Sequence, residues 1–412
     1  LYPVNPNADE ILGHKCYHAV TDIPETADLA VVSTPRSQVP KVVGECTGKG
    51  IKAIIIVTQG FADADEHGET LQAEVTRIAR EGGARLMGPN TFGTSNAFHN
   101  FTSAFAPVDL QPVPIGMICQ TGLFMAGIPG FPMMGKGIDL GNGCDIDFAD
   151  GLEYFEDDPE VKVVLLHVEA IKNGTRFMEV AGRVSRKKPV LVLKTGRGEQ
   201  AARAVQSHTG SLAGSDRVYE AAFRQCGLIR VSGIDEFQDF TRAFLRLPPM
   251  RGDGVGIVSI AGAGGVMTID ACDRYGLRLG RPSAETLDKI SHLAPPWQTL
   301  DNPSDIWPAI MIARHPVDHV LCTVADAFLS DADIDAIIIV THAGLLFGAP
   351  EVFQRVGRFD KPVVSWLYGS GMEHVIDGFE EKGEAVVYPN VERAVRALAR
   401  LKQYHDYLRK TE

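Results

Sequence analysis

The segment Pro189-Val190-Leu191-Val192-Leu193-Lys194 is a short apolar run between a proline and a lysine, and this pattern predicts a buried β-strand. The loop after it contains Gln206-Ser207-His208-Thr209-Gly210-Ser211-Leu212-Ala213-Gly214, which is too polar for a strand and too rich in glycine for the interior of a helix. Residues 217–226 then have helical spacing, with Ser215 or Asp216 as the predicted N-cap. A strand, a loop and a helix in this order are typical of a parallel α/β sheet.

The histidine in this loop, His208, is the first candidate for catalysis. Its hydroxyl and glycine neighbours leave it open to a substrate from several sides. Imidazole has an unperturbed pKa close to neutrality, so its neutral form can serve as a nucleophile. The alternative is a loop histidine with an ordinary hydrogen bond.

The composition is typical of a soluble globular protein with roughly two to four domains, because 45% of the 412 residues are hydrophobic and 22% are charged. The net charge of −12 argues against a nucleic-acid-binding protein, and no run of 18 apolar residues predicts a membrane span. The seven cysteines never form a Cys-x-x-Cys pair, which favours reduced thiols in a cytoplasmic protein over disulfides or a metal site. Because the chain opens on Leu1 and not on methionine, we expect it to be part of a longer protein.

The first segment, residues 1–111, alternates apolar runs with amphipathic stretches. Strands are expected at 29–33, 53–57 and 84–87, and helices at 39–49 and 68–81. This alternation predicts βαβ units and a parallel sheet that is covered on both faces.

Polar turns follow these three strands. They contain Thr34-Pro35-Arg36, Thr58-Gln59-Gly60 and Pro89-Asn90. Because ligands of parallel sheets bind beyond the carboxyl ends of the strands, these residues should line one crevice. The sequence therefore predicts a site for a nucleotide-sized ligand at this edge.

The second segment, residues 112–250, opens after a proline-marked junction. Its strand at 115–118 leads into Gln120-Thr121-Gly122 and a short helix, which is either an anion site at a helix N-terminus or an ordinary turn. A strand at 161–166 ends close to Glu169. In a parallel sheet Glu169 lies at the same edge as the His208 loop, where its carboxylate could accept the imidazole Nδ1–H and stabilise a charged ring. A surface glutamate is the alternative.

The third segment, residues 251–412, repeats the plan of the second in a weak internal repeat. A strand at 254–260 leads into Gly262-Ala263-Gly264-Gly265 and a helix at 266–275. Two more strands and a closing helix are expected at 336–340, 362–366 and 391–407. The glycine turn lacks the GxGxxG spacing of a dinucleotide site, so a nicotinamide oxidoreductase is the least supported interpretation.

Several motifs together make a family resemblance specific. They are Thr58-Gln59-Gly60-Phe61, Gly88-Pro89-Asn90, Leu140-Gly141-Asn142, Asp145-Ile146-Asp147, Glu169, Lys194-Thr195-Gly196-Arg197 and Ser207-His208-Thr209-Gly210. In this order they resemble the ADP-forming (NDP-forming) acyl-CoA synthetases, or acetate–CoA ligase α subunits, of the succinyl-CoA synthetase superfamily. The resemblance implies an α/β fold with a Rossmann-like CoA-binding domain (1–111) and two flavodoxin-like domains (112–250 and 251–412). It also implies that a first βα unit with a phosphate loop precedes Leu1.

The resemblance assigns roles to the candidate residues. His208 would carry a phosphoryl group and Glu169 would support it. The strand-end turns of the first segment would bind coenzyme A through Thr34, Pro35, Arg36, Thr58, Gln59, Gly60, Pro89 and Asn90. Two phosphate-binding turns would surround His208. One contains Gln120, Thr121 and Gly122, and the other contains Gly262, Ala263, Gly264 and Gly265. ATP, ADP and Mg²⁺ would bind an ATP-grasp partner, either a β subunit in an α2β2 assembly or a fused C-terminal domain; a homo-oligomer is the other arrangement. The substrate would be a small carboxylic acid.

Two departures from the family pattern accompany the resemblance. Ile128-Pro129-Gly130-Phe131-Pro132 should stop the helix after Gly122 within about two turns, which alters the wall of the acyl pocket. Ser304 replaces the usual residue in the Asn302-Pro303-Ser304-Asp305 turn. The interrupted helix and the missing first βα unit favour a non-catalytic module of the same fold that binds CoA or acyl-CoA, which is the alternative to an enzyme.

Overall fold

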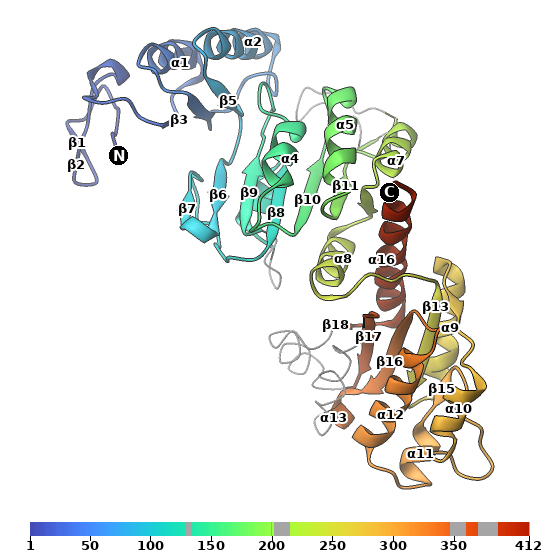
Figure 1. The fold of residues 1–412 in the computed structure, drawn as a ribbon. Coiled ribbons are helices and arrows are strands. Elements are labelled where there is room, and N and C mark those ends of the chain that lie inside the picture. Colours follow the sequence, from blue (N-terminus) through green and yellow to red (C-terminus); the bar gives the residue numbers. More distant parts are fainter. Residues whose placement is uncertain (129–133, 199, 202–214, 347–359, 370–385, 412) are drawn as a thin grey trace. The chain divides into compact units, whose positions relative to one another are not determined.

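The computed structural model describes residues 1–128, 134–198, 200–201, 215–346, 360–369 and 386–411. The chain forms two compact units, Leu1–Ser232 and Gly233–Glu412. Each unit contains parallel sheets with helices packed against them (Figure 1). This confirms the predicted α/β class.

The first unit begins with a small parallel sheet of order β3-β4-β5. Its strands are short apolar runs, and helices α1 and α2 pack on each other beside it because their buried faces carry Val39, Val43, Leu71 and Val75. The elements of this part are β1 (Glu10–Ile11), β2 (His14–Lys15), η1 (Val20–Asp22), β3 (Leu29–Val32), η2 (Arg36–Gln38), α1 (Val39–Gly48), β4 (Ala53–Ile56), α2 (Glu66–Glu81) and β5 (Arg85–Met87).

The second sheet of this unit has seven strands in the order β12-β11-β10-β8-β9-β6-β7. From β8 to β12 all pairings are parallel, whereas β6 and β7 add an antiparallel edge. Numbered along the chain from β8, the parallel part has the 2-1-3-4-5 order of flavodoxin-like folds. Its elements are β6 (Thr94–Asn96), η3 (Ala97–His99), β7 (Phe101–Thr102), β8 (Ile115–Cys119), α3 (Gly122–Ala126), β9 (Lys136–Asp139), α4 (Phe148–Glu156), β10 (Val163–Val168), α5 (Gly174–Val184), β11 (Val190–Lys194), α7 (Asp216–Gln225) and β12 (Ile229–Val231).

The second unit has a sheet of order β14-β13-β16-β17-β18, with the short β15 paired to β13. All its pairings are parallel, and numbering from β13 again gives 2-1-3-4-5. The expected repeat of two flavodoxin-like units is therefore present in the strand order. The elements are α8 (Ile234–Arg246), β13 (Gly254–Ser259), α9 (Gly262–Tyr275), β14 (Arg278–Leu279), α10 (Ala284–Ser291), β15 (Ser304–Asp305), α11 (Trp307–Met311), α12 (Val317–Ser330), β16 (Ala336–His342), α13 (Ala343–Leu346), β17 (Val363–Tyr368), β18 (Val386–Tyr388) and α16 (Val391–Thr411).

The predicted segment boundaries at residues 111/112 and 250/251 stay predictions, but strands β6 and β7 and helix α8 make contacts across them. Strands β6 and β7 lie within residues 1–111 but join the sheet of the following segment through β9. Helix α8 precedes residue 250 but packs on α16, where Arg393 donates to both carboxylate oxygens of Asp239 at 2.5 and 2.7 Å.

The helix that begins at Gly122 ends at Ala126, sooner than the two predicted turns. Gly127 ends it with φ +96, a backbone conformation that glycine adopts without steric cost. The early stop predicted from the proline-rich stretch is therefore confirmed, although residues 129–133 themselves lie outside the described part of the chain.

Candidate functional site

The carboxyl ends of β3, β4 and β5 border an open cavity of about 650 Å³, a size suited to a small-molecule ligand. Five of the eight residues predicted to bind a cofactor line it, namely Thr34, Pro35, Thr58, Gln59 and Asn90. The remaining walls come from Ser33, Val57, Thr91, Phe92, Phe105, Gly122 and Asp139. We call this cavity the crevice.

The other three predicted residues lie beside the crevice and not in its lining. The guanidinium of Arg36 donates to the carbonyl oxygen of Gly60 at 2.7 Å and to Asp65 at 2.9 Å, so it braces the turn after β4. The carbonyl oxygen of Pro89 accepts the backbone N–H of Asn142 at 2.9 Å.

The second part of the candidate site is the point between β8 and β10, where the strand order of the flavodoxin-like sheet reverses. Glu169 directly follows β10, and Gln120 directly follows β8. The side-chain oxygen of Gln120 accepts the backbone N–H groups of Glu169 at 2.8 Å and Ala170 at 3.1 Å. Ligands of such sheets bind at this switch point, and Glu169 is buried there.

A histidine that the sequence did not single out lies two residues before Glu169. His167 is buried, its Nε2 is 3.2 Å from the hydroxyl of Thr195, and its ring centroid is 4.9 Å from that of Phe124. Burial, with a smaller contribution from the charge of Lys194, lowers the pKa of His167 to about 4. The ring is therefore neutral at physiological pH.

Two lysines also stand at this edge. Lys194 ends β11, and its buried ammonium donates to the carbonyl oxygen of Thr195 and lies 4.7 Å from the centroid of the Tyr219 ring. Burial lowers the pKa of Lys194. The exposed Lys172 follows Glu169 by three residues and donates to the carbonyl oxygens of Asn142 at 2.7 Å and Gly143 at 3.3 Å.

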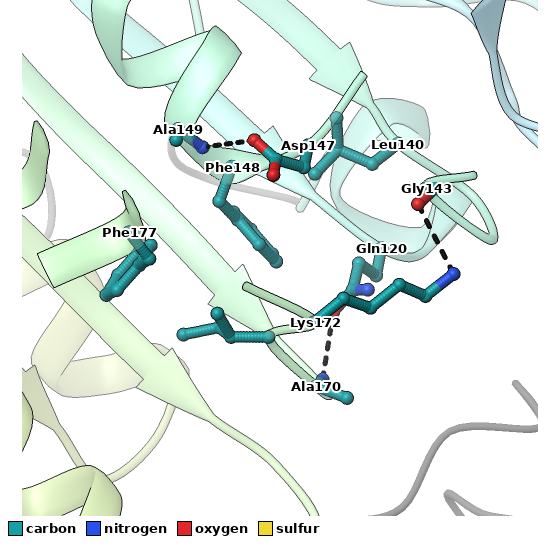
Figure 2. A pocket seen from close by; sticks show the side chains of 10 residues that line it. Gln120, Leu140, Gly143, Asp147, Phe148, Ala149, Ala170, Lys172 and Phe177 are labelled. Atoms are coloured by element: carbon teal, nitrogen blue, oxygen red, sulfur yellow. Dashed lines mark hydrogen bonds between the residues drawn. The ribbon is translucent and has the colours of Figure 1, made fainter. Parts of the chain in front are cut away.

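A small, mainly apolar cavity lies beside Lys172 and Gln120 (Figure 2). The rings of Phe148 and Phe177 lie on one side of it, and Gln120 and Lys172 lie on the other. The loop after β9 and the segment after β10 both contribute to its lining, through Leu140 and Gly143 and through Ala170 and Lys172.

Asp139, at the end of β9, is a buried carboxyl group in the lining of the crevice. Its carboxylate accepts the backbone N–H groups of Phe92 at 2.6 Å and Gly141 at 3.3 Å. Burial, with a smaller contribution from the charge of Glu169, raises the pKa of Asp139 to about 6, although the hydrogen bonds to its carboxylate lower it. Nothing in the local sequence indicated this residue.

The predicted residues of the second unit begin a helix. Gly262, Ala263, Gly264 and Gly265 form the first turn of α9, after Ala261 at the N-cap. A Cβ on Gly264 would lie 2.8 Å from Val340 and one on Gly265 3.2 Å from Pro303, so close packing explains the last two glycines. The predicted cradle of two helix ends around His208 stays a prediction, because residues 202–214 lie outside the described part of the chain.

Neither a metal cluster nor a membrane span emerges from the parts of the chain that the structure describes. Among those residues, no group of three or more histidine, cysteine, aspartate or glutamate side chains is placed to hold a metal ion. No described helix is both long and apolar enough to cross a bilayer. All seven cysteines are free thiols.

The fold and the two strand-end sites define the class of this protein. The family model "CoA binding domain" matches residues 1–97, and the model "Succinyl-CoA ligase like flavodoxin domain" matches residues 112–244. Acetate–CoA ligase (ADP-forming) I subunit alpha of Pyrococcus furiosus is 36% identical over 428 residues, which cover 99% of this chain and 90% of the relative. The chain belongs to the family of ADP-forming acetate–CoA ligases, as the resemblance predicted.

Two further relatives extend the comparison. Acetate–CoA ligase (ADP-forming) II of Archaeoglobus fulgidus is 37% identical over 420 residues, and the chain spans only 61% of its length. The structure of the dinucleotide forming acetyl-coenzyme A synthetase 1 of Ca. Korarchaeum cryptofilum in complex with phosphate and ADP superimposes with a TM-score of 0.88 at 31% identity, covering 100% of this chain and 90% of that one.

Proposed function

We propose that the chain is the α-type part of an acid–CoA ligase that makes acyl-CoA from a carboxylic acid, CoA and ATP, releasing ADP and phosphate. The observation that carries the proposal is the adjacency of two sites in one unit. The crevice at the ends of β3–β5 is lined by Asn90 from the CoA-binding domain and by Gly122 and Asp139 from the ligase domain. A ligand in the crevice therefore contacts the turn after β8 whose Gln120 binds the Glu169 segment.

The chemistry proposed for the chain's own residues is the one that the family resemblance implies. His208 takes the phosphoryl group of ATP on a ring nitrogen, and Glu169 holds the ring and stabilises its charge. A carboxylate oxygen of the acid attacks the phosphorus, the P–N bond breaks, and an acyl phosphate and neutral His208 result. The CoA thiol then attacks the acyl carbon, the C–O bond to phosphate breaks, and phosphate leaves with the electron pair while the thiol proton passes to phosphate or solvent.

Coenzyme A fits the residues of the crevice. Thr34, Thr58 and Asn90 supply hydrogen-bonding groups at the strand ends, and the rings of Phe92 and Phe105, with centroids 4.7 Å apart, supply apolar surface. Such a mixture of apolar walls and a few polar groups is what a cofactor-sized ligand requires.

The nucleotide, Mg²⁺ and the partner belong to the same proposal. The name of the Pyrococcus furiosus relative contains "subunit alpha", which supports a partner subunit here, with an ATP-grasp fold and an α2β2 assembly as the proposed arrangement. ATP and Mg²⁺ would bind that partner or a fused domain. The seven free thiols fit a cytoplasmic location.

The alternative is a non-catalytic module that binds CoA or acyl-CoA. The short helix α3, which ends at Ala126, is the observation that favours it, because it alters a wall close to the crevice. This module would bind CoA but would never become phosphorylated.

A labelling experiment separates the two functions. The complete enzyme, with its ATP-grasp part, is incubated with ATP labelled at the γ-phosphate. The ligase should acquire an acid-labile and alkali-stable label that is absent from His208→Ala. A label that persists in His208→Ala refutes the assigned residue, and a wild-type protein that binds CoA without any label supports the module.

Glu169→Gln tests the second catalytic assignment. This variant keeps the shape of the side chain and loses the charge, so it should fold with normal stability while the phosphoenzyme accumulates more slowly. Loss of the orienting carboxylate costs up to roughly 10⁴-fold in rate in serine proteases, which sets an upper guide. Turnover at the wild-type rate would show that Glu169 has no catalytic role.

A further inference from the structure

Asn142, in the loop after β9, joins the CoA-binding domain to the ligase domain through its side chain. Its amide nitrogen donates to the carboxylate of Asp63 at 2.7 Å and to the side-chain oxygen of Gln72 at 2.9 Å. Its amide oxygen is 3.5 Å from the amide nitrogen of Asn90. The residue is only 3% exposed, so these contacts are made away from water and contribute more than surface contacts would.

The partners of Asn142 shape the crevice. Asp63 accepts the backbone N–H groups of Gly60 at 3.1 Å and Phe61 at 3.0 Å, which fixes the turn that carries Gln59. Asn90 lines the crevice directly. The side chain of Asn142 therefore contacts residues that support or form two walls of the crevice.

The backbone of Asn142 faces the other domain's site. Its carbonyl oxygen accepts the ammonium of Lys172 at 2.7 Å, and Lys172 lies three residues after Glu169. One residue thus contacts Asn90, a residue of the crevice wall, through its side chain and the Glu169 segment through its main chain.

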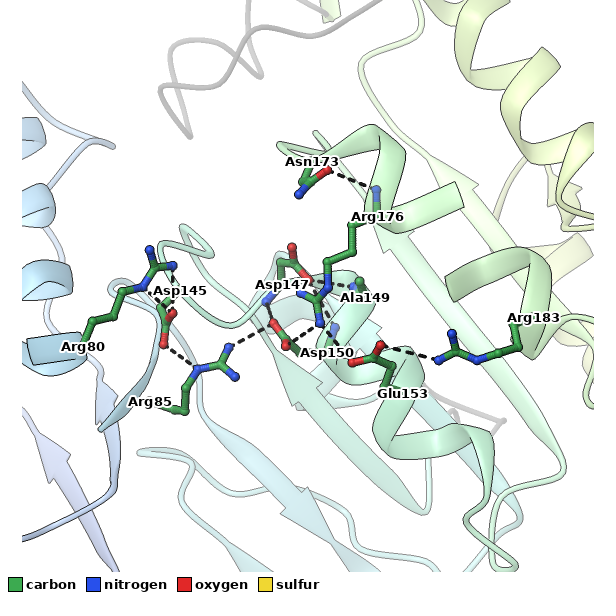
Figure 3. A network of polar contacts seen from close by, with 10 residues as sticks. All are labelled: Arg80, Arg85, Asp145, Asp147, Ala149, Asp150, Glu153, Asn173, Arg176 and Arg183. Atoms are coloured by element: carbon green, nitrogen blue, oxygen red, sulfur yellow. Dashed lines mark hydrogen bonds and ion pairs between the residues drawn. The ribbon is translucent and has the colours of Figure 1, made fainter. Parts of the chain in front are cut away.

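Hydrogen bonds and ion pairs hold the rest of this loop against the CoA-binding domain (Figure 3). Cys144 and Ile146 donate their backbone N–H groups to Gly88 at 3.1 Å and Leu86 at 3.1 Å, so the loop runs antiparallel beside β5. The buried carboxylate of Asp145 accepts Arg80 at 2.9 Å and Arg85 at 2.9 Å. These contacts should keep the loop folded when the side chain of Asn142 is changed.

We propose that Asn142 is a positioning residue that sets the crevice in register with the Glu169 edge, so that acyl transfer to CoA depends on it and phosphorylation of the enzyme does not. This inference rests on the proposed function. The thiol sulfur must meet the acyl carbon at close range as the C–O bond to phosphate breaks, and a displacement of about 1 Å can cost roughly 10²-fold in rate. Phosphorylation by ATP requires no CoA bound in the crevice, although Gly122 of the predicted phosphate-binding turn also lines it.

Asn142→Ala in the complete enzyme tests the inference. It removes the contacts to Asp63, Gln72 and Asn90 but leaves the carbonyl that binds Lys172. Thioester formation from acyl phosphate and CoA should slow by roughly 10–10²-fold, while phosphoenzyme formation from ATP stays within about twofold. Equal losses in both half-reactions, or a loss in neither, would overturn the proposal.

Exchanging the amide of Asn142 with the carboxylate of Asp63 distinguishes loss of this contact from poor folding of the variant. Asn142→Asp alone places two carboxylates together and should slow thioester formation more than Asn142→Ala does. Adding Asp63→Asn restores a donor and an acceptor across the same contact, although the amide leaves the backbone N–H of Phe61 without its acceptor, so the double variant should recover part of the lost rate. No recovery in a folded double variant contradicts the inference.

A matched control uses an asparagine with a purely local contact. Asn96 caps the short helix η3 by accepting the backbone N–H of Phe98 at 3.1 Å. Asn96→Ala should change the two half-reactions in the same proportion. If the wild-type complete enzyme forms no thioester at all, the proposed function is wrong. If the wild type turns over normally but Asn142→Ala slows both half-reactions equally or slows neither, only the role proposed for Asn142 is wrong.

Discussion

The side-chain oxygen of Gln120 lies 2.8 Å from the backbone nitrogen of Glu169, across the point where the strand order of the ligase-domain sheet reverses. The same oxygen accepts the N–H of Ala170. Two adjacent N–H groups at the end of β10 therefore depend on one side chain for their hydrogen bonds, and this contact fixes the backbone from which the Glu169 side chain extends.

Removal of that oxygen should be costly. Gln120→Ala leaves the two N–H groups without their acceptor in a buried position, and each unsatisfied group costs about 1–3 kcal/mol. We expect a lower urea midpoint of unfolding and a slower phosphorylation step. Gln120→Glu keeps an acceptor at the same place and should retain most of the stability, so equal midpoints for the two variants would contradict this account.

Much of the fold follows from local patterns. The strands β3, β4, β8, β10, β11, β13, β16 and β17 are apolar runs, and each was predicted within two residues at its start. Strands β6 and β9 were not predicted, because Thr94–Asn96 is polar and Lys136–Asp139 alternates a lysine, a glycine and an aspartate around one apolar residue. The two strands pair with each other, and β9 also pairs with β8 while β6 also pairs with β7, which no local pattern records.

The candidate site also contains some residues that the sequence pattern indicates and others that it does not. Residues that follow a strand, such as Gln120, Glu169 and Asn90, could be predicted because parallel strands bring their carboxyl ends to one edge. Asp139 and His167 could not, because their properties come from burial among residues distant in the sequence. Asn142 belongs to the Leu140-Gly141-Asn142 motif, but its contacts with Asp63 and Gln72 depend on the path of the loop between the two domains and not on the motif.

His167 should make the protein less stable in mild acid. Its pKa is about 4 in the folded state and 6.5 in the unfolded chain, so the unfolded state binds more protons between these values. The free energy of unfolding should therefore fall as the pH drops from 6.5 towards 4, by at most about 3 kcal/mol from this group. Urea unfolding of His167→Gln should show a smaller decrease over this range, and parallel curves for the two proteins would contradict the assignment.

Asp139 should make the protein less stable as the pH rises, which is the opposite of the effect of His167. Its folded-state pKa is about 6 and its ordinary value is 3.8, so the folded state binds more protons between them. The free energy of unfolding should fall as the pH rises through this window, and the penalty persists above pH 6. Relative to the wild type, Asp139→Asn should gain stability between pH 4.5 and 7.5, by up to about 3 kcal/mol. A difference that does not change with pH would show that the carboxyl group does not titrate there.

The last prediction compares two glycines of the loop after β9. Gly141 and Gly143 have nearly the same backbone conformation, with φ +53 and +55, so alanine pays a similar conformational cost of roughly 1–2 kcal/mol at either position. Their surroundings differ. A Cβ on Gly141 would lie 2.7 Å from the carbonyl carbon of Asn90 and closer still to the carbonyl oxygens of Pro89 and Asn90, whereas a Cβ on Gly143 has its nearest neighbour at 3.7 Å.

Gly141→Ala should therefore destabilise the protein by about 1–3 kcal/mol more than Gly143→Ala, because the clash adds an overpacking cost to the conformational one. It should also weaken CoA binding, since relief of the clash requires the Pro89-Asn90 turn at the wall of the crevice to move. Urea unfolding and calorimetric titration with CoA measure the two effects separately. If the two variants have the same midpoint and the same affinity for CoA, the loop does not press against the crevice wall as closely as the structure indicates.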